Sequence, residues 1–198
     1  MKIEIDVPDG KSGKWEVSTF TVSEADARIA SMRAIFSSQK GRGGIQPREY
    51  KKLTRNGYLI MSNAPDECRD FMHFVHIASG SVLVNGLGLG CLLKALLEKP
   101  KVTEVIVIEK SPDVIALVAE TYRKDPRVTI IEADAFTWQP PKGKFYDFVW
   151  HDIWDDLTSD NLPEMAKLHR KYVKRCNYQE SWCKRECQQA KRRNYYQK

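Results

Sequence analysis

The 198-residue chain has no long hydrophobic run, since no segment approaches the ~18 consecutive apolar residues of a membrane span. It also lacks a disulfide framework, because its five cysteines are odd in number and follow no spacing typical of small secreted domains. Residues 1–6 alternate and carry acids, unlike a signal peptide. We therefore expect a cytoplasmic protein with reduced thiols and no membrane partner.

A metal-binding pattern is missing as well. The chain contains no Cys-x-x-C motif, and the spacing of His169, Cys176, Cys183 and Cys187 matches no standard zinc site. We therefore expect no metal.

The charge is distributed unevenly. Apolar residues make up 42% of the chain and charged residues 29%, which is typical of a globular protein. Residues 167–198 contain eleven Lys/Arg and two Glu, a net charge of +9, against +6 for the whole chain. This basic segment could contact nucleic acid, or it could form the solvated face of helices; the pattern leaves both readings open.

The most informative segment is residues 82–90, Val-Leu-Val-Asn-Gly-Leu-Gly-Leu-Gly, an apolar strand that runs into a glycine-spaced turn. Nineteen residues after Gly90, a second apolar run ends in Glu109. Glycines let the backbone approach a ligand closely, and an acid at the tip of the next strand can accept both ribose hydroxyl protons. Together these features predict a βαβ unit that binds an adenosine-containing ligand.

The spacing of the glycines in the turn narrows the class of ligand that it can bind. Dinucleotide sites need Gly-x-Gly-x-x-Gly, whereas Gly86, Gly88 and Gly90 follow Gly-x-Gly-x-Gly and Cys91 stands at the third glycine position. This pattern resembles motif I of class I S-adenosylmethionine-dependent methyltransferases. Residues 130–136 (IIEADAF) and 146–152 (YDFVWHD) resemble the third and fourth strands of that family, and the spermidine-synthase-like branch, with its small phage-type members, is the most similar.

The resemblance implies a transferase with S-adenosylmethionine as cofactor and a specific set of contacts. The cofactor-binding candidates are Asn85, Gly86, Gly88, Gly90, Glu109, Lys110, Asp134 and Ala135. Asp134 stands where the family contacts the adenine amino group, and Asn85 where many relatives have an acid for the methionine amino group. Asp152 is the candidate for binding and deprotonating the acceptor, with His151 as a second candidate base or, alternatively, a core histidine.

The sequence says less about the acceptor, the molecule that would receive the transferred group. His151-Asp152-Ile153-Trp154 replaces the Asp/Asn-Pro-Pro-Tyr/Phe tetrapeptide of exocyclic-amine DNA methyltransferases, and no cysteine follows a proline as C5-cytosine methylation requires. A small-molecule amine therefore fits best. Aminopropyl transfer from decarboxylated S-adenosylmethionine is one alternative, and a non-catalytic protein that binds nucleic acid or protein through its basic tail is another.

The chain divides into three predicted regions: a hairpin-rich extension (1–78), a parallel-sheet binding core (79–157) and a basic helical segment (158–198). In the first region, strands at 3–7 and 15–19 are predicted to form a hairpin around a turn at Pro8-Asp9-Gly10, and Asn56-Gly57 is the turn of a second hairpin. Between the hairpins, Ser23 and Asp26 predict a capping box at the start of a helix whose buried face contains Ala25, Ile29, Met32 and Phe36. A flexible loop at 37–46 follows this helix and contains a basic stretch at Lys40–Gly44. No strand is predicted after Asp160, so we expect a truncated Rossmann-like α/β fold. Its fourth strand would then be a bare edge, which predicts a homo-oligomer.

Overall fold

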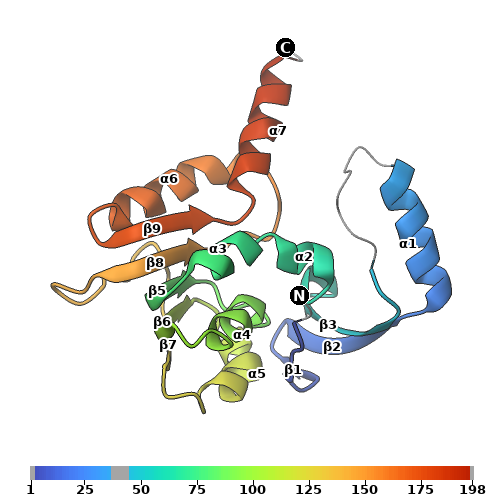
Figure 1. Cartoon of the computed structure of the whole chain (residues 1–198), viewed down its shortest axis with the longest axis horizontal. Helices are drawn as coiled ribbons and strands as arrows, with labels where there is room; N and C mark the ends of the chain where they lie inside the picture. The colour runs from blue at the N-terminus through green and yellow to red at the C-terminus, as the bar shows by residue number, and fades with distance from the viewer. Residues whose placement is uncertain (1–2, 37–44, 197–198) are drawn as a thin grey trace.

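The computed structural model describes residues 3–36 and 45–196, apart from the side chains of residues 33–36 and 194–196. Its centre is a parallel sheet of five strands in the order β7-β6-β5-β8-β9 (Figure 1). The strands are β5 (Gly80–Asn85), β6 (Val102–Glu109), β7 (Val128–Glu132), β8 (Tyr146–His151) and β9 (Cys176–Ser181). The predicted α/β parallel-sheet class is confirmed. The strand order reverses between β5 and β8, which places a crevice at their carboxyl ends.

The last strand corrects the sequence prediction. Residues 176–181, where only helices were expected, pair with β8 in parallel, with Phe148 opposite Tyr178. The segment is polar and its own pattern is weak, but Tyr178 packs against the core through the rings of Phe74 and Phe148. Tertiary packing thus overrides a weak local preference. The sheet continues beyond residue 157, so β8 is not the bare edge on which the homo-oligomer prediction rested.

Helices cover both faces of this sheet. On one face lie α3 (Met72–Ile77), α4 (Cys91–Leu97) and α5 (Pro112–Tyr122), and on the other lies α6 (Asn161–Tyr172). The strand residues alternate accordingly: Val82, Val84, Val105 and Val107 join the first core, whereas Leu83, Ile106, Ile108 and Val149 join the second. Burial on both faces explains the continuous apolar runs in these strands.

A separate antiparallel sheet stands beside the parallel one and contains β1 (Gly10–Ser12), β2 (Trp15–Val22), β3 (Arg48–Arg55) and β4 (Tyr58–Ser62) (Figure 1). The hairpin predicted at Asn56-Gly57 is confirmed, with φ of 52° and 81°. Of the first predicted hairpin, the strand at 15–19 is confirmed within β2, but the turn and the strand at 3–7 are wrong. Its turn falls at Gly13-Lys14 rather than at Pro8-Asp9-Gly10, and Ile3, Ile5 and Val7 pack into the main core without forming a strand.

The helix α1 (Glu24–Phe36) follows β2, and its start is the predicted capping box, since Ser23 Oγ accepts from the Asp26 amide and donates to the Asp26 carboxylate. Its predicted buried face is wrong for Ile29 and Met32, which are 45% and 55% exposed. Ala25 is exposed too. The loop predicted to be flexible at 37–46, with Lys40–Gly44, falls largely outside the described residues.

Two further helices complete the chain, α2 (Pro65–Arg69) and α7 (Lys184–Tyr196). The latter projects from the body of the molecule (Figure 1), and its basic residues Arg185, Lys191, Arg192 and Arg193 are exposed. None of the helices in the described parts of the chain is long and apolar enough to span a membrane.

Candidate functional site

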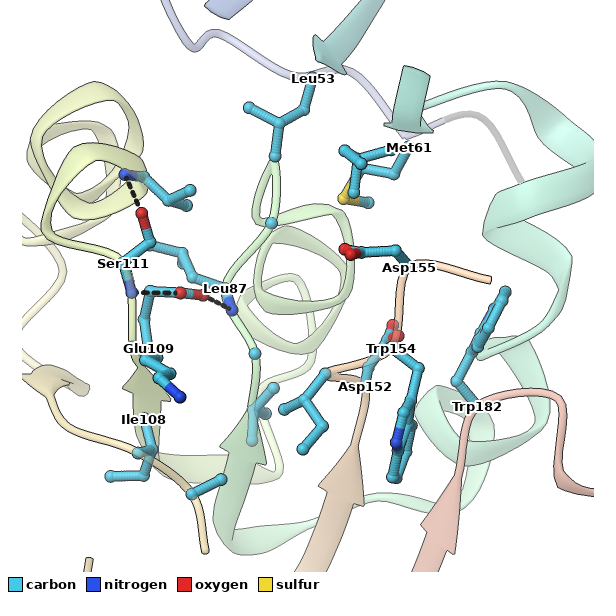
Figure 2. Close-up of a pocket in the computed structure, with 18 of the residues that line it drawn as sticks. Leu53, Met61, Leu87, Ile108, Glu109, Ser111, Asp152, Trp154, Asp155 and Trp182 are labelled. Carbon is cyan, nitrogen blue, oxygen red and sulfur yellow. Dashed lines mark hydrogen bonds between the residues drawn. The ribbon is translucent and has the colours of Figure 1, made fainter. Parts of the chain in front are cut away.

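A cavity of about 730 Å³ opens at the carboxyl ends of the central strands. One wall is formed by the turns after β5, β6, β7 and β8, and the facing wall by the antiparallel sheet (Figure 2). The residues predicted from the sequence that line it are Gly86, Gly88, Glu109, Lys110, Asp134, Ala135 and Asp152. Asn85, Gly90 and His151 are not part of the lining.

The glycine turn is fixed by close backbone contacts. Gly86 has a φ of 103°, and a Cβ there would collide with the backbone carbonyl of Asp152. Gly88 has a φ of 51°, and a Cβ there would collide with the thioether of Met61, whose sulfur also accepts a hydrogen bond from the Leu89 amide at 3.2 Å. Backbone crowding therefore requires glycine at Gly86, whereas at Gly88 the positive φ favours glycine because the Met61 side chain could move away. Met61 of β4 also ties the antiparallel sheet to the turn.

Gly90 has a different role from its two neighbours. It begins α4 with a φ of 75°, and its missing Cβ makes room for the ring of Tyr122. The Tyr122 hydroxyl donates to the Leu89 carbonyl at 3.1 Å. Gly90 thus allows α5 to pack against the turn from behind, outside the cavity.

Glu109, at the end of β6, is held by two backbone amides. One carboxylate oxygen accepts from Leu87 N and the other from Ser111 N, both at 2.8 Å (Figure 2). A carboxylate has about four acceptor positions, so further donors can bind to the same oxygens. The geometry fixes an acceptor pair beside the glycine turn, where vicinal hydroxyls of a ribose would be recognised.

The neighbouring strand end carries a second acid. Asp134 accepts from the Phe136 amide at 2.8 Å and pairs with the Lys110 ammonium at 2.8 Å. The hydrogen bond from Lys110 is the main reason that the pKa of Asp134 lies below its usual value. Two residues predicted independently as cofactor contacts are therefore paired with each other, next to Ala135 and Phe136 in the lining.

Asp152 follows β8 and lies across the cavity from Glu109, with Trp154 and Trp182 beside it (Figure 2). Burial raises the pKa of Asp152 to about 7, and the negative charges of Asp70 and Glu67 act in the same direction. The Trp150 indole lies close enough to Asp152 to lower its pKa against this increase. The Trp150 N–H nevertheless makes no hydrogen bond of good geometry with the described residues. Asp152 is thus a carboxyl that gains and loses a proton near neutral pH.

His151 and Asn85 point to the other face of the sheet. The Asn85 amide lies 2.8 Å from His151 Nδ1, and the His151 ring packs against His169 and Tyr172 of α6. Burial lowers the pKa of His151 to about 3, which keeps the ring neutral. The structure supports the core-histidine reading, and it places Val84, not Asn85, in the cavity wall. Neither side chain is positioned to touch a ligand in the cavity.

Sequence reasoning missed the facing wall. The antiparallel sheet contributes Lys14, Trp15, Leu53, Arg55, Ile60, Met61 and Ser62, and the β9–α7 turn contributes Trp182. None of these positions belongs to a motif, and their approach depends on how two sheets pack. The Glu67 carboxylate also lines the cavity, held by the amide and hydroxyl of Ser62 at 2.5 and 2.7 Å.

The overall lining is acidic and aromatic. It contains seven carboxylates against three Lys/Arg, together with Trp15, Trp150, Trp154 and Trp182. Such a cavity favours a ligand with positive charge. Within the described residues no group of three or more His, Cys, Asp or Glu is arranged to hold a metal ion, and the five thiols are unpaired.

These features define a Rossmann-like α/β protein with a cavity at the carboxyl ends of its parallel strands. No family model matches the chain. Over 134 residues it is 34% identical to polyamine aminopropyltransferase 1 of Streptomyces coelicolor, a match that covers 61% of this chain and 24% of that protein. The chain therefore spans about a quarter of the curated relative.

The solved structures with a similar arrangement include several methyltransferases. The 23S rRNA methyltransferase ErmE is 16% identical over 57% of this chain and 43% of that one, with a TM-score of 0.45. A dimethyladenosine transferase from Plasmodium falciparum is 21% identical over 56% and 37%, with a TM-score of 0.41. The plantazolicin methyltransferase BpumL in complex with SAH is 14% identical over 56% and 41%, with a TM-score of 0.40.

Proposed function

We propose that the protein is an S-adenosylmethionine-dependent transferase, with methyl transfer to an amine as its reaction. The observation that carries the proposal is the Glu109 carboxylate, fixed by the Leu87 and Ser111 amides directly beside the glycine turn. Gly86 and Gly88 hold the turn in a conformation with positive φ, and in this conformation the turn lines the cavity, where an adenosine would lie against it. The turn before α4 follows the spacing Gly-x-Gly-x-Gly and not the Gly-x-Gly-x-x-Gly of pyrophosphate-binding turns, which favours a phosphate-free ligand.

Each residue then has a defined part. Glu109 would accept the ribose hydroxyls, and Asp134 with the backbone of Ala135 and Phe136 would hold the adenine edge. Lys110, as the partner of Asp134, keeps that carboxylate ionised. The acidic lining would stabilise the positive charge of a sulfonium.

The acceptor would approach from the side of Asp152. When bound, S-adenosylmethionine would supply an electrophilic carbon for the amine nitrogen and would leave as the neutral thioether. Asp152 would accept the proton released by the amine, a role for which its pKa of about 7 is suited near neutral pH. The indoles of Trp154 and Trp182 lie beside it and would orient a cationic acceptor through their ring faces.

Aminopropyl transfer is the second candidate, and the charge of the inner cavity favours it. Around Asp152 the lining includes Glu67, whose pKa burial raises, whereas the basic residues Arg55 and Lys110 pair with Asp155 and Asp134. A donor without a carboxylate would meet less repulsion there. The name of the Streptomyces relative, polyamine aminopropyltransferase 1, is in line with this alternative.

Calorimetric titration distinguishes the two. Preference for S-adenosylmethionine over its decarboxylated form supports methyl transfer, and the reverse preference supports aminopropyl transfer. Incubation with the preferred donor and a panel of diamines and polyamines, followed by mass spectrometry, would then detect either a methyl or an aminopropyl addition. Absence of binding by both donors would contradict the proposal.

A further inference from the structure

Lys171 makes an unusual set of contacts from the last turn of α6. Its ammonium donates to the carbonyl oxygens of Ala135 at 2.8 Å and Phe136 at 3.3 Å, and also to the carbonyl of Trp138. An ammonium has three N–H donors, so these three carbonyls match its full capacity. The contacts join residues more than thirty positions apart in the chain.

The segment that Lys171 holds is the turn after β7, residues 134–138. Inside this turn the amides of Thr137 and Trp138 both donate to the carbonyl of Asp134, at 3.1 and 2.8 Å. The Phe136 amide donates to the Asp134 carboxylate. These bonds engage amides of the turn, and Lys171 engages three of its carbonyls, so both kinds of backbone group in the turn have partners.

A second lysine of α6 acts on the same turn. The Lys167 ammonium lies 5.0 Å from the centre of the Phe136 ring, one helical turn before Lys171. The apolar side chains of Ala135, Phe136 and Trp138 pack against the same core as Leu168 and Tyr172 of α6. The contact between α6 and the turn is therefore both apolar and charged.

We propose that Lys171 is a positioning residue for the base-recognition end of the cavity. It does not line the cavity itself, but two of the residues that it binds, Ala135 and Phe136, do, as does the adjoining Asp134. By fixing three carbonyls it sets the direction of the Asp134 carboxylate and of the Phe136 ring. Base selectivity at the β7 end thus depends on a residue of α6, on the far side of the turn. This inference rests on the proposed adenosine ligand.

The test compares wild type with Lys171→Met, using S-adenosylhomocysteine and its inosine analogue as probes in calorimetry. The two probes differ only at the base edge, where an amino group becomes a carbonyl. We expect Lys171→Met to bind S-adenosylhomocysteine about tenfold more weakly and to lose most of the wild-type preference for adenine over hypoxanthine. A general loss of stability would weaken both probes equally and leave that preference intact.

Arg170→Met is the matched control, because it removes one positive charge from the same helical turn at an exposed position. It should keep the wild-type affinity and preference. Lys171→Arg is the conservative variant, and since a planar guanidinium fits three converging carbonyls less well, it should fall between the two. If Lys171→Met does not fold, Lys171→Arg can be compared with wild type in its place.

Hydrogen exchange separates this inference from the proposed function, because it needs no ligand. The amides of Phe136, Thr137 and Trp138 should exchange faster in Lys171→Met than in wild type, with the amides of β6 unchanged. Unchanged exchange and an unchanged base preference would overturn the inference. If wild type binds neither probe, the proposed function fails and the base-selectivity role fails with it, while the exchange result still decides whether Lys171 holds the turn.

Discussion

Arg55 and Asp155 form an ion pair that joins the two walls of the cavity. The guanidinium comes from the end of β3 and the carboxylate from the loop after β8, one hundred residues further along the chain. The Arg55 guanidinium also lies 5.2 Å from the centre of the Trp15 ring. A second connection, from the Ser12 hydroxyl to the Asp113 carboxylate at 2.8 Å, joins the β1–β2 hairpin to α5. Together with the contact between Met61 and the Leu89 amide, these two connections attach the antiparallel sheet to the binding core beside the cavity.

Loss of the Arg55–Asp155 pair should affect ligand exchange more than stability. Both side chains are 35% exposed, so Arg55→Ala should lower the free energy of unfolding by less than about 1 kcal/mol. Without the pair, the antiparallel sheet is held less firmly, and S-adenosylhomocysteine should dissociate several-fold faster in stopped-flow measurements. Arg28→Ala, which breaks the exposed pair with Glu24 on α1, is the control. Equal dissociation rates in the two variants would contradict this prediction.

Glu109→Ala should weaken binding of S-adenosylmethionine by about 1.5–3 kcal/mol, because hydrogen bonds to a charged acceptor are lost. Glu132→Ala is a close control, since Glu132 ends β7 directly opposite Glu109 in the sheet register but is exposed and outside the lining. Calorimetry on both variants gives the comparison. Similar losses in both, or none in Glu109→Ala, would mean that the ligand binds elsewhere.

The raised pKa of Asp152 predicts that the rate of transfer depends on pH. Since burial raises its pKa to about 7, the carboxylate form that accepts a proton becomes populated as the pH rises through 7. The rate of transfer should therefore increase with pH across this range in wild type. Asp152→Asn should bind the donor with nearly unchanged affinity, transfer slowly and lose this pH dependence. A profile for the variant with the same inflection would assign the titration to another group.

The same residue predicts a pH dependence of stability. The folded protein keeps the Asp152 proton up to a pH of about 7, whereas the unfolded chain releases it near the ordinary aspartate pKa of 3.8. The folded state therefore binds more protons between these values, and this residue's contribution to the free energy of unfolding must fall as pH rises from about 4 to 7. Denaturant titrations of wild type and Asp152→Asn should show the variant gaining relative stability over this window. A constant difference would contradict the raised pKa.

Gly86→Ala should be far more disruptive than Gly143→Ala. Both glycines have positive φ, 103° and 80°, so both substitutions carry backbone strain of about 1 kcal/mol or more. Only at Gly86 would the new Cβ also meet backbone, the Asp152 carbonyl, whereas nothing lies within 4 Å at Gly143. Denaturation curves should show a loss at least twice as large for Gly86→Ala. Equal losses would mean that the turn can move away from Asp152.

The parts of the fold that local pattern specifies were predictable from the sequence. The strands and helices from Gly80 to His151 follow from apolar periodicity, and Gly86, Gly88 and Glu109 from their spacing. The hairpin at Asn56-Gly57 followed from turn chemistry. In each case a short segment carries the whole signal.

What could not be predicted depends on long-range packing. Strand β9 is polar, and it forms because it pairs with β8 and because Tyr178 packs against Phe74. Helix α1 leaves Ile29 exposed, although its sequence pattern predicted an amphipathic helix. Adjacent strand residues face opposite sides of a sheet, which is why Val84 enters the cavity while Asn85 turns toward α6. The role inferred for Lys171 likewise arises from contact between distant segments.

The most direct test of the account is a calorimetric titration of the protein with S-adenosylmethionine, S-adenosylhomocysteine, decarboxylated S-adenosylmethionine and NAD. The account predicts micromolar binding of at least one adenosyl sulfur ligand, reduced in Glu109→Ala and retained in Glu132→Ala, with no comparable binding of NAD. Binding of NAD alone, or of none of the four, would contradict it.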